Sequence, residues 1–188
     1  MENAPEENSF YIIANNLALD LANTVTGELD GESLGAWAKA VGLFGEKPAG
    51  NWREKSVADV IQFRDKLREI VITLVETKDI SDAEISWINK ALGRKSGHSE
   101  LVRSAEGFAK RSRIEINEPK DIAFPVIESF VDLVAFGNID YIRKCERSEC
   151  LLYFYDTTKN HKRRWCSMAV CGNRAKVAKF YERQRSKG

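Results

Sequence analysis

The sequence predicts an α+β fold, mainly α, in which a helical N-terminal domain with a small β-hairpin precedes a compact four-cysteine module. Apolar residues recur at the spacing of amphipathic helices through most of residues 1–140. All four cysteines stand in two close pairs within residues 141–188, a segment too short to rely on an apolar core. The chain of 188 residues can bury a substantial core elsewhere. We therefore expect two domains, 1–140 and 141–188.

Four helices are expected before the hairpin of the first domain. A short helix covers residues 17–23, within NNLALDLANTV. Residues 33–42 place apolar side chains on one face, and the longest helix runs from about 55 to 77. A capping box begins the fourth helix, because the Ser81 hydroxyl and the Glu84 carboxylate can each satisfy a free backbone amide.

A hairpin and a last helix complete this domain. Alternating polar and apolar residues predict a β-hairpin within residues 101–116, turning near Gly107. Pro119 and Pro125 then flank the entry to a helix of about residues 125–136, whose apolar side chains predict burial.

No catalytic chemistry assembles in the first domain, so we do not expect an enzyme. The sequence has no glycine-rich phosphate loop, no HExxH and no nucleophile elbow, and its two histidines, His98 and His161, accompany no catalytic motif. Asp20 and Asn23 lie among apolar residues, where they either satisfy backbone groups or line a possible ligand pocket. The first alternative is favoured because most buried polar groups bond to neighbours.

The net charge of +1 conceals an asymmetry. From residue 143 onward the formal charge is +9, whereas the preceding part of the chain carries −8. Such asymmetry predicts a polyanion-binding tail on an acidic body. A solvated basic surface without a partner is the alternative.

The expected location of the protein bears on its cysteine chemistry. The N-terminal sequence MENAPEENSF lacks the features of a signal peptide, and the most apolar stretch, residues 124–139, is too short for a bilayer span. We therefore expect a cytoplasmic protein with no membrane partner. In a reducing cytoplasm the cysteines should remain thiols, which favours metal ligation over disulfides.

The cysteine spacing is that of a zinc site. Cys145-x4-Cys150 and Cys166-x4-Cys171 are separated by fifteen residues, and two close pairs at this separation are typical of a tetrahedral four-thiolate centre. Four protein ligands leave no open position, so we expect one structural zinc ion. Four incidental buried cysteines, or a redox pair, are the alternatives.

The residues around the cysteines predict an order of elements. Residues 151–155 have high β propensity, 156–162 are turn-like and 163–165 lead back to the second pair, which indicates a knuckle followed by a hairpin. Ser167 is a suitable N-cap for a helix that ends at about Arg185. The order of knuckle, hairpin and helix is that of a treble-clef zinc finger.

Two segments carry a family resemblance. The segment from Trp165 to Lys176, WCSMAVCGNRAK, closely resembles the CGNR zinc-finger family. The earlier NNLALDLANTV segment resembles the opening motif of the ABATE-type domain, which precedes this finger in bacterial proteins. The resemblance implies a stress-linked transcription regulator with a DNA-binding finger and an N-terminal sensing domain.

The last helix is expected to have two different faces. At about 100° per residue, Val177, Ala178 and Tyr181 share an apolar face that we expect to be buried. The opposite face is basic and, with two arginines at the end of the hairpin, is expected to contact phosphates. These nucleic-acid-binding candidates are Arg163, Arg164, Lys176, Lys179 and Arg183.

The motif residues that follow the second cysteine pair along this helix receive structural roles. Arg174 falls on the apolar side of the helix, so we expect it to turn inward and bond to carbonyl groups. Gly172 is expected to permit close approach of the backbone, and Asn173 is left without an assigned role.

The leading hypothesis is therefore a DNA-binding transcription regulator. Its N-terminal domain would sense a small-molecule effector, form a homodimer, or do both. The alternative is a zinc-dependent module that binds RNA or a protein and docks on its own acidic domain, since opposite charges attract.

Overall fold

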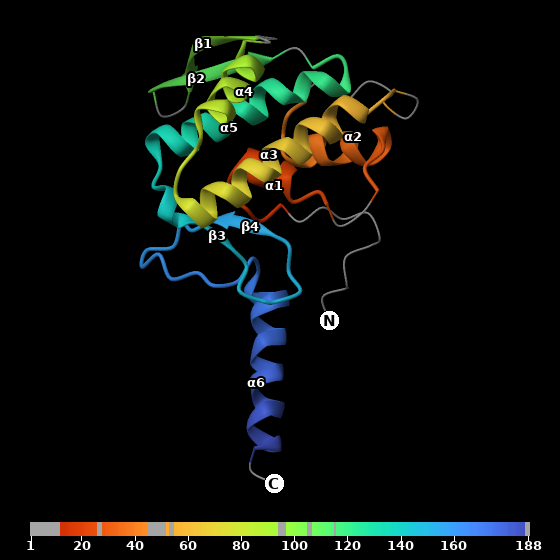
Figure 1. Cartoon of the computed structure of the whole chain (residues 1–188). Helices are drawn as coiled ribbons and strands as arrows, with labels where there is room; N and C mark the ends of the chain where they lie inside the picture. Colours follow the sequence, from red (N-terminus) through yellow and green to blue (C-terminus); the bar gives the residue numbers. More distant parts are fainter. Residues whose placement is uncertain are drawn as a thin grey trace.

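Most helices gather into one body, and the last helix projects from it alone (Figure 1). The computed structural model describes residues 12–25, 28–44, 52, 55–93, 97–104, 107–114 and 116–186. The described helices are α1 (Leu17–Ala22), α2 (Gly31–Ala40), α3 (Ala58–Thr77), α4 (Asp82–Leu92), α5 (Ala123–Phe136) and α6 (Asn173–Arg185). The described strands are β1 (Gly97–Ser104), β2 (Gly107–Ile114), β3 (Ile142–Lys144) and β4 (Tyr153–Tyr155). Short helical turns occur at η1 (Pro119–Ile122), η2 (Ile139–Tyr141) and η3 (Met168–Gly172). The fold is mainly helical, as predicted.

Side-chain caps fix where several helices begin. Asn16 caps α1 by accepting hydrogen bonds from two backbone N–H groups. Asp30 and Ser33 form a capping box, so α2 begins at residue 31, earlier than the sequence predicted. The predicted capping box of Ser81 and Glu84 is present at the start of α4. Within the described part of the chain, no helix combines the length and the apolar character needed to cross a membrane.

The first hairpin confirms the predicted pair of strands and lengthens it. β1 pairs antiparallel with β2, from Gly97 opposite Ile114 to Ser104 opposite Gly107. The residues between the strands, 105–106, lie outside the described residues. The hairpin stands at the end of the molecule opposite to α6 (Figure 1).

The second hairpin corrects the pairing predicted around the cysteines. β4 pairs antiparallel with β3, which places Lys144 opposite Tyr153, and does not pair with residues 163–165. The carbonyl of Arg164 instead accepts a hydrogen bond from the N–H of Glu146, at 3.0 Å. The first cysteine pair therefore lies in the loop of a hairpin whose first strand precedes it.

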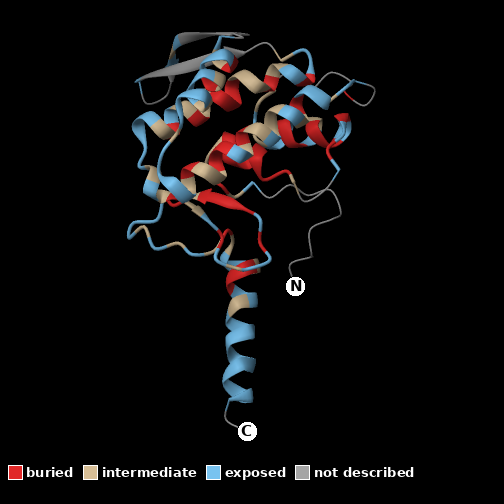
Figure 2. Ribbon diagram, in the orientation of Figure 1, coloured by how far each residue is buried: buried red, intermediate tan, exposed pale blue. Residues whose placement is uncertain are grey.

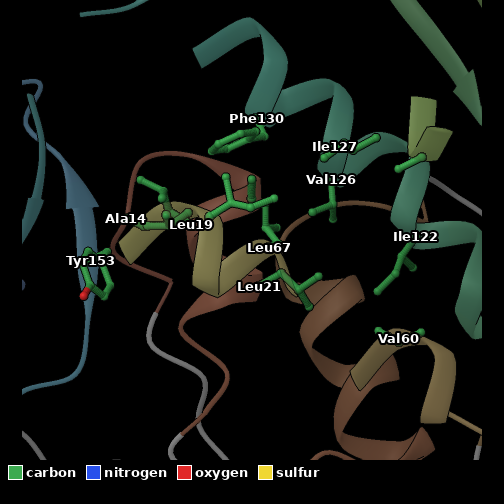
Figure 3. Packing of buried hydrophobic residues seen from close by; sticks show 14 of the residues in the cluster. Ala14, Leu19, Leu21, Val60, Leu67, Ile122, Val126, Ile127, Phe130 and Tyr153 are labelled. Carbon is green, nitrogen blue, oxygen red and sulfur yellow. The ribbon is translucent and has the colours of Figure 1, made fainter. Parts of the chain in front are cut away.

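The main core joins residues from both predicted domains. Leu19, Leu67 and Phe130, from α1, α3 and α5, are fully buried and pack at its centre (Figure 3). Ile142 and Tyr153, from the second hairpin, belong to the same cluster. Each buried side chain of this size contributes about 1.5–3 kcal/mol to stability. The hairpin is therefore stabilised by the helical body.

A pair of hydrogen bonds joins α1 to the free edge of β4. The side-chain amide of Asn23 donates to the carbonyl of Tyr153 at 2.8 Å and accepts from the N–H of Tyr153 at 2.9 Å. It therefore satisfies both backbone groups of that residue, as a neighbouring strand would. Arg68 of α3 donates to the carbonyl of Leu151 at 2.7 Å beside this contact. We call the hydrogen bonds of Asn23 and Arg68 to residues 151–153 the β4 clasp.

We expect Asn23→Ala to lower the free energy of unfolding by about 2–4 kcal/mol, because it leaves two buried backbone groups of Tyr153 without partners. Chemical denaturation of the zinc-loaded protein measures this change. Asn89→Ala is the matched control, since Asn89 is exposed on α4 and should change stability by less than about 0.5 kcal/mol. Equal effects of the two substitutions would contradict the role of the β4 clasp.

Candidate zinc centre and nucleic-acid interface

The four cysteines converge on one point. Cys145 and Cys150 lie in the loop between β3 and β4, whereas Cys166 precedes η3 and Cys171 lies within it. All four side chains are buried, and their sulfur atoms lie within 4.8 Å of one another. The Sγ atom of Cys166 is 3.7 Å from that of Cys150 and 3.5 Å from that of Cys171.

These sulfur distances fit a single tetrahedral ion. A zinc–sulfur bond of about 2.3 Å places the sulfurs of a tetrahedron about 3.8 Å apart. A disulfide needs a separation of about 2.05 Å, and all four cysteines are free. The cysteines are therefore not joined by disulfides in this structure. Four thiolates leave no open coordination position, so the centre can hold a structural ion.

The pKa values of the cysteine thiols indicate how a bound ion would stabilise the thiolates. Burial raises the pKa of the Cys150 thiol to about 11, and burial also raises the pKa of Cys166. Burial opposes ionisation of Cys145 as well, but the backbone N–H groups of Cys166 and Arg147 outweigh it and lower the pKa of Cys145. A bound cation supplies the positive charge that stabilises the remaining thiolates.

The turn η3 presents the second cysteine pair and starts α6. Ser167 caps it, as the sequence predicted. A Cβ atom at Gly172 would stand 2.9 Å from Cδ1 of Trp165, so the backbone packs directly against that ring. The amide of Asn173 donates to the carbonyl of Ala169 at 3.0 Å. Both motif residues therefore have identifiable packing or bonding roles.

Arg163 lies within the hydrogen-bond network of the protein itself. Its guanidinium donates to the carbonyls of Ile13 at 2.9 Å and Trp165 at 3.1 Å, and also to that of Cys166. The same group lies 4.2 Å from the ring centroid of Phe154. Because its donors bind carbonyls, Arg163 connects the zinc centre to the N-terminal segment. Its predicted phosphate contact stays a prediction.

A basic groove of about 740 Å³ lies beside the zinc centre, along the segment between β4 and η3. The residues that line it are Asn15, Thr157, Thr158, Lys159, Asn160, Lys162, Arg163, Arg164, Trp165, Ser167 and Met168. Every charged residue among them is a cation. Arg164 lies over the ring of Trp165 and also pairs with Glu146 at 2.6 Å. The sequence reasoning did not select Lys159 and Lys162, although four cations within residues 159–164 gave the signal.

A buried carboxylate organises the loop that forms this groove. Asp156 is fully buried and accepts hydrogen bonds from the N–H and the hydroxyl of Thr158, at 3.0 and 2.6 Å, and from the N–H of Arg163 at 2.8 Å. Burial opposes its ionisation, but these hydrogen bonds and the charge of Arg143 outweigh burial and hold the pKa of Asp156 below its usual value. Asp156 is therefore a charged centre of the loop.

The structure corrects the predicted burial of the apolar face of α6. Val177 and Tyr181 are 55% and 62% exposed, and the adjacent Phe180 is 58% exposed. Arg174 is also exposed, so the expectation that it turns inward is wrong. The reason is that α6 leaves the body after η3 and buries none of its residues (Figure 2). The basic candidates on α6, which are Lys176, Lys179 and Arg183, are exposed too.

The two candidate pocket residues have backbone partners. The Asp20 carboxylate accepts from the N–H groups of Ile13 and Ala14, both at 3.0 Å, and burial raises the pKa of Asp20. The carbonyl of Ala14 in turn accepts from the N–H of Tyr155 at 2.8 Å. Asn23 forms the β4 clasp. Both side chains thus satisfy backbone groups, which is the alternative that the sequence favoured. A ligand contact of Asp20 or Asn23 stays a prediction.

Two family models match the chain. The CGNR zinc-finger model matches residues 141–184, which include all four cysteines. The ABATE model, described as a putative stress-induced transcription regulator, matches residues 15–137. No curated protein matches the chain. The CGNR match and the four-cysteine cluster together support one structural zinc ion.

The purified protein should contain one zinc ion per chain, and Cys171→Ser should reduce this content at least tenfold, because one of four ligands is lost. Elemental analysis after dialysis measures the content. Ser148→Ala, an exposed substitution in the loop between the first cysteines, is the control and should retain the ion. Undiminished zinc in Cys171→Ser would contradict the assigned ligands.

Asp156→Asn should destabilise the protein by about 2–4 kcal/mol at pH 7, because an amide cannot accept all of the donors around it. The depressed pKa of Asp156 stabilises the fold above the unfolded value of about 3.9, and this contribution is lost as pH falls through the folded pKa. The difference in unfolding free energy between the two proteins should therefore shrink as pH falls toward 3. A difference that stays constant would argue against the charged carboxylate.

Proposed function

Because the chain belongs to the ABATE family and ends in a CGNR zinc finger, we propose that it is a transcription regulator that binds duplex DNA through its C-terminal end. The observation that carries this proposal is the cationic surface formed by α6 and the basic groove. On this proposal the protein is not an enzyme, and it acts in the cytoplasm on bacterial DNA. The zinc ion holds the hairpin and the start of α6 in place.

The positions of the cations support binding to phosphates. Lys159 and Lys162 are exposed at the basic groove, and Lys176, Lys179 and Arg183 are exposed along α6. The body that carries them is acidic, with a formal charge of −8 before residue 143. A polyanion would therefore be attracted to this end of the molecule and repelled by the remainder.

A small-molecule effector would find a place in the N-terminal domain. A groove of about 410 Å³ lies among α3, α4 and α5, and Leu74, Ile88 and Phe130 are among its apolar lining residues. Its volume lies within the usual range for sites of small ligands. Asn89 and Lys78 supply polar groups there. We place the effector in this groove rather than at Asp20, whose carboxylate already has backbone partners.

The alternative in which the basic module docks on its own acidic domain has less support. The hairpin of β3 and β4 does contact the body, but it does so through the β4 clasp and apolar packing. The basic helix α6 points away from the body (Figure 1). In this arrangement α6 would not have to separate from acidic residues before it binds a partner.

We expect the zinc-loaded protein to bind duplex DNA with a strong dependence on salt. Five exposed cations are counted as phosphate contacts: Lys159, Lys162, Lys176, Lys179 and Arg183. If each neutralises one phosphate, the logarithm of the affinity falls with the logarithm of salt concentration at a slope of about −4.5. Arg183→Ala should reduce the steepness by about 0.9. Fluorescence anisotropy with labelled duplexes measures both values.

Lys90→Ala is the control, because Lys90 is exposed on α4 in the body, and it should leave the slope unchanged. Absence of binding to any genomic fragment at low salt would refute the proposal. Tighter binding of RNA than of DNA duplexes would favour the alternative.

A further inference from the structure

The exposed face of α6 has an order that a simple phosphate-binding surface does not require. At about 100° per residue, Val177, Phe180, Tyr181 and Gln184 fall within an arc of about 100°, which we call the central stripe. Their apolar members are more than half exposed. A solvated helix gains nothing from such a stripe, so it indicates a surface for a partner.

Cations border the central stripe on both sides. Lys176 and Arg183 lie along one border, and Arg174 and Arg185 lie along the other. Lys179 lies farther back on the helix. Glu182, the acidic residue of the helix, falls on the opposite face. The helix therefore presents a band of apolar and amide groups between two rows of positive charge.

We infer that α6 enters the major groove of duplex DNA with the central stripe facing the base edges and the two rows of cations facing the opposite phosphate backbones. This inference rests on the proposed function. A helix with its side chains is about 10–12 Å wide, which matches the major groove of about 12 Å. The deep, narrow major groove of an RNA duplex does not admit such a helix. The helix of 13 residues is about 20 Å long, enough to cross several base pairs.

The chemistry of the stripe specifies the bases that it fits. The amide of Gln184 can pair with N6 and N7 of adenine, and Val177 and Phe180 offer apolar contacts to the methyl group of thymine. The recognised site therefore contains A·T pairs at the positions below the stripe.

Other partners suit this face less well. In a helix pair formed by two copies, the rows of cations would face each other, and three apolar side chains bury far less than the roughly 1,200–2,000 Å² of a stable interface. In a membrane surface, the Gln184 amide would lie at the centre of the apolar face, where its burial is costly.

Selection from a pool of random duplexes with the full-length, zinc-loaded protein tests the inference. We expect an enriched motif that contains A·T pairs. Gln184→Ala should weaken binding to the enriched duplex by about tenfold and binding to an unselected duplex by less than twofold. Arg183→Ala should weaken both, because phosphate contacts do not depend on sequence.

A matched pair of neighbouring residues isolates the stripe. Val177→Ser should weaken binding to the enriched duplex, whereas Ala178→Ser, which lies outside the central stripe, should not. Replacement of each motif thymine by uracil removes only a methyl group and should cost the wild-type protein about fourfold at one position. The Val177→Ser protein should lose less at that position.

Three results would overturn the inference. Binding to duplexes without an enriched motif, or equal behaviour of Val177→Ser and Ala178→Ser, would leave DNA binding intact but remove the role of the stripe. Tighter binding to vesicles of anionic phospholipid than to the enriched duplex would assign the stripe to membranes. Failure to bind any duplex would instead refute the proposed function, so the two failures are distinguishable. Zinc content and thermal unfolding of each variant verify that it is folded.

Discussion

The β4 clasp is the contact on which the arrangement of the molecule depends. A three-residue strand paired on one side only has little stability of its own. On its other side, Asn23 bonds to Tyr153 and the carbonyl of Ala14 bonds to Tyr155, and the buried side chain of Tyr153 packs into the helical core. The strand is therefore built by the N-terminal domain as much as by its partner β3. The zinc finger consequently has a fixed orientation on the body.

The zinc centre extends this fixed orientation to the C-terminal helix. Two of its ligands come from the loop of the clasped hairpin, and the other two lie just before η3 and within it. The ion thus joins a segment held by the body to the first turn of a helix that has no support of its own. Isolated helices of this length are marginally stable in water, so the metal and a bound partner are the available sources of order for α6.

This construction separates stabilising cations from cations that are free to bind a partner. Arg68 and Arg163 donate hydrogen bonds to backbone carbonyls. These bonds hold the N-terminal segment, the hairpin of β3 and β4 and the zinc loop together. The lysines of the basic groove and of α6 stay exposed. A guanidinium can bind several carbonyls through its planar set of donors, which suits Arg68 and Arg163 to this role. The positive charge of the last part of the chain is thus divided between Arg163, whose donors bind carbonyls, and lysines whose side chains are exposed.

The sequence by itself determined the features whose causes are local. Cysteine spacing identified the ligands, helical periodicity located most helices, and the residues of the capping box marked the start of α4. Tertiary structure decided the remaining features, because they depend on partners distant in sequence. The strand that pairs with β4, the bonds of Asn23 and the engagement of Arg163 all join segments that no local pattern relates. Periodicity likewise gave α6 an apolar face but could not show that none of the described body residues buries it, and so Arg174 and Val177 are exposed.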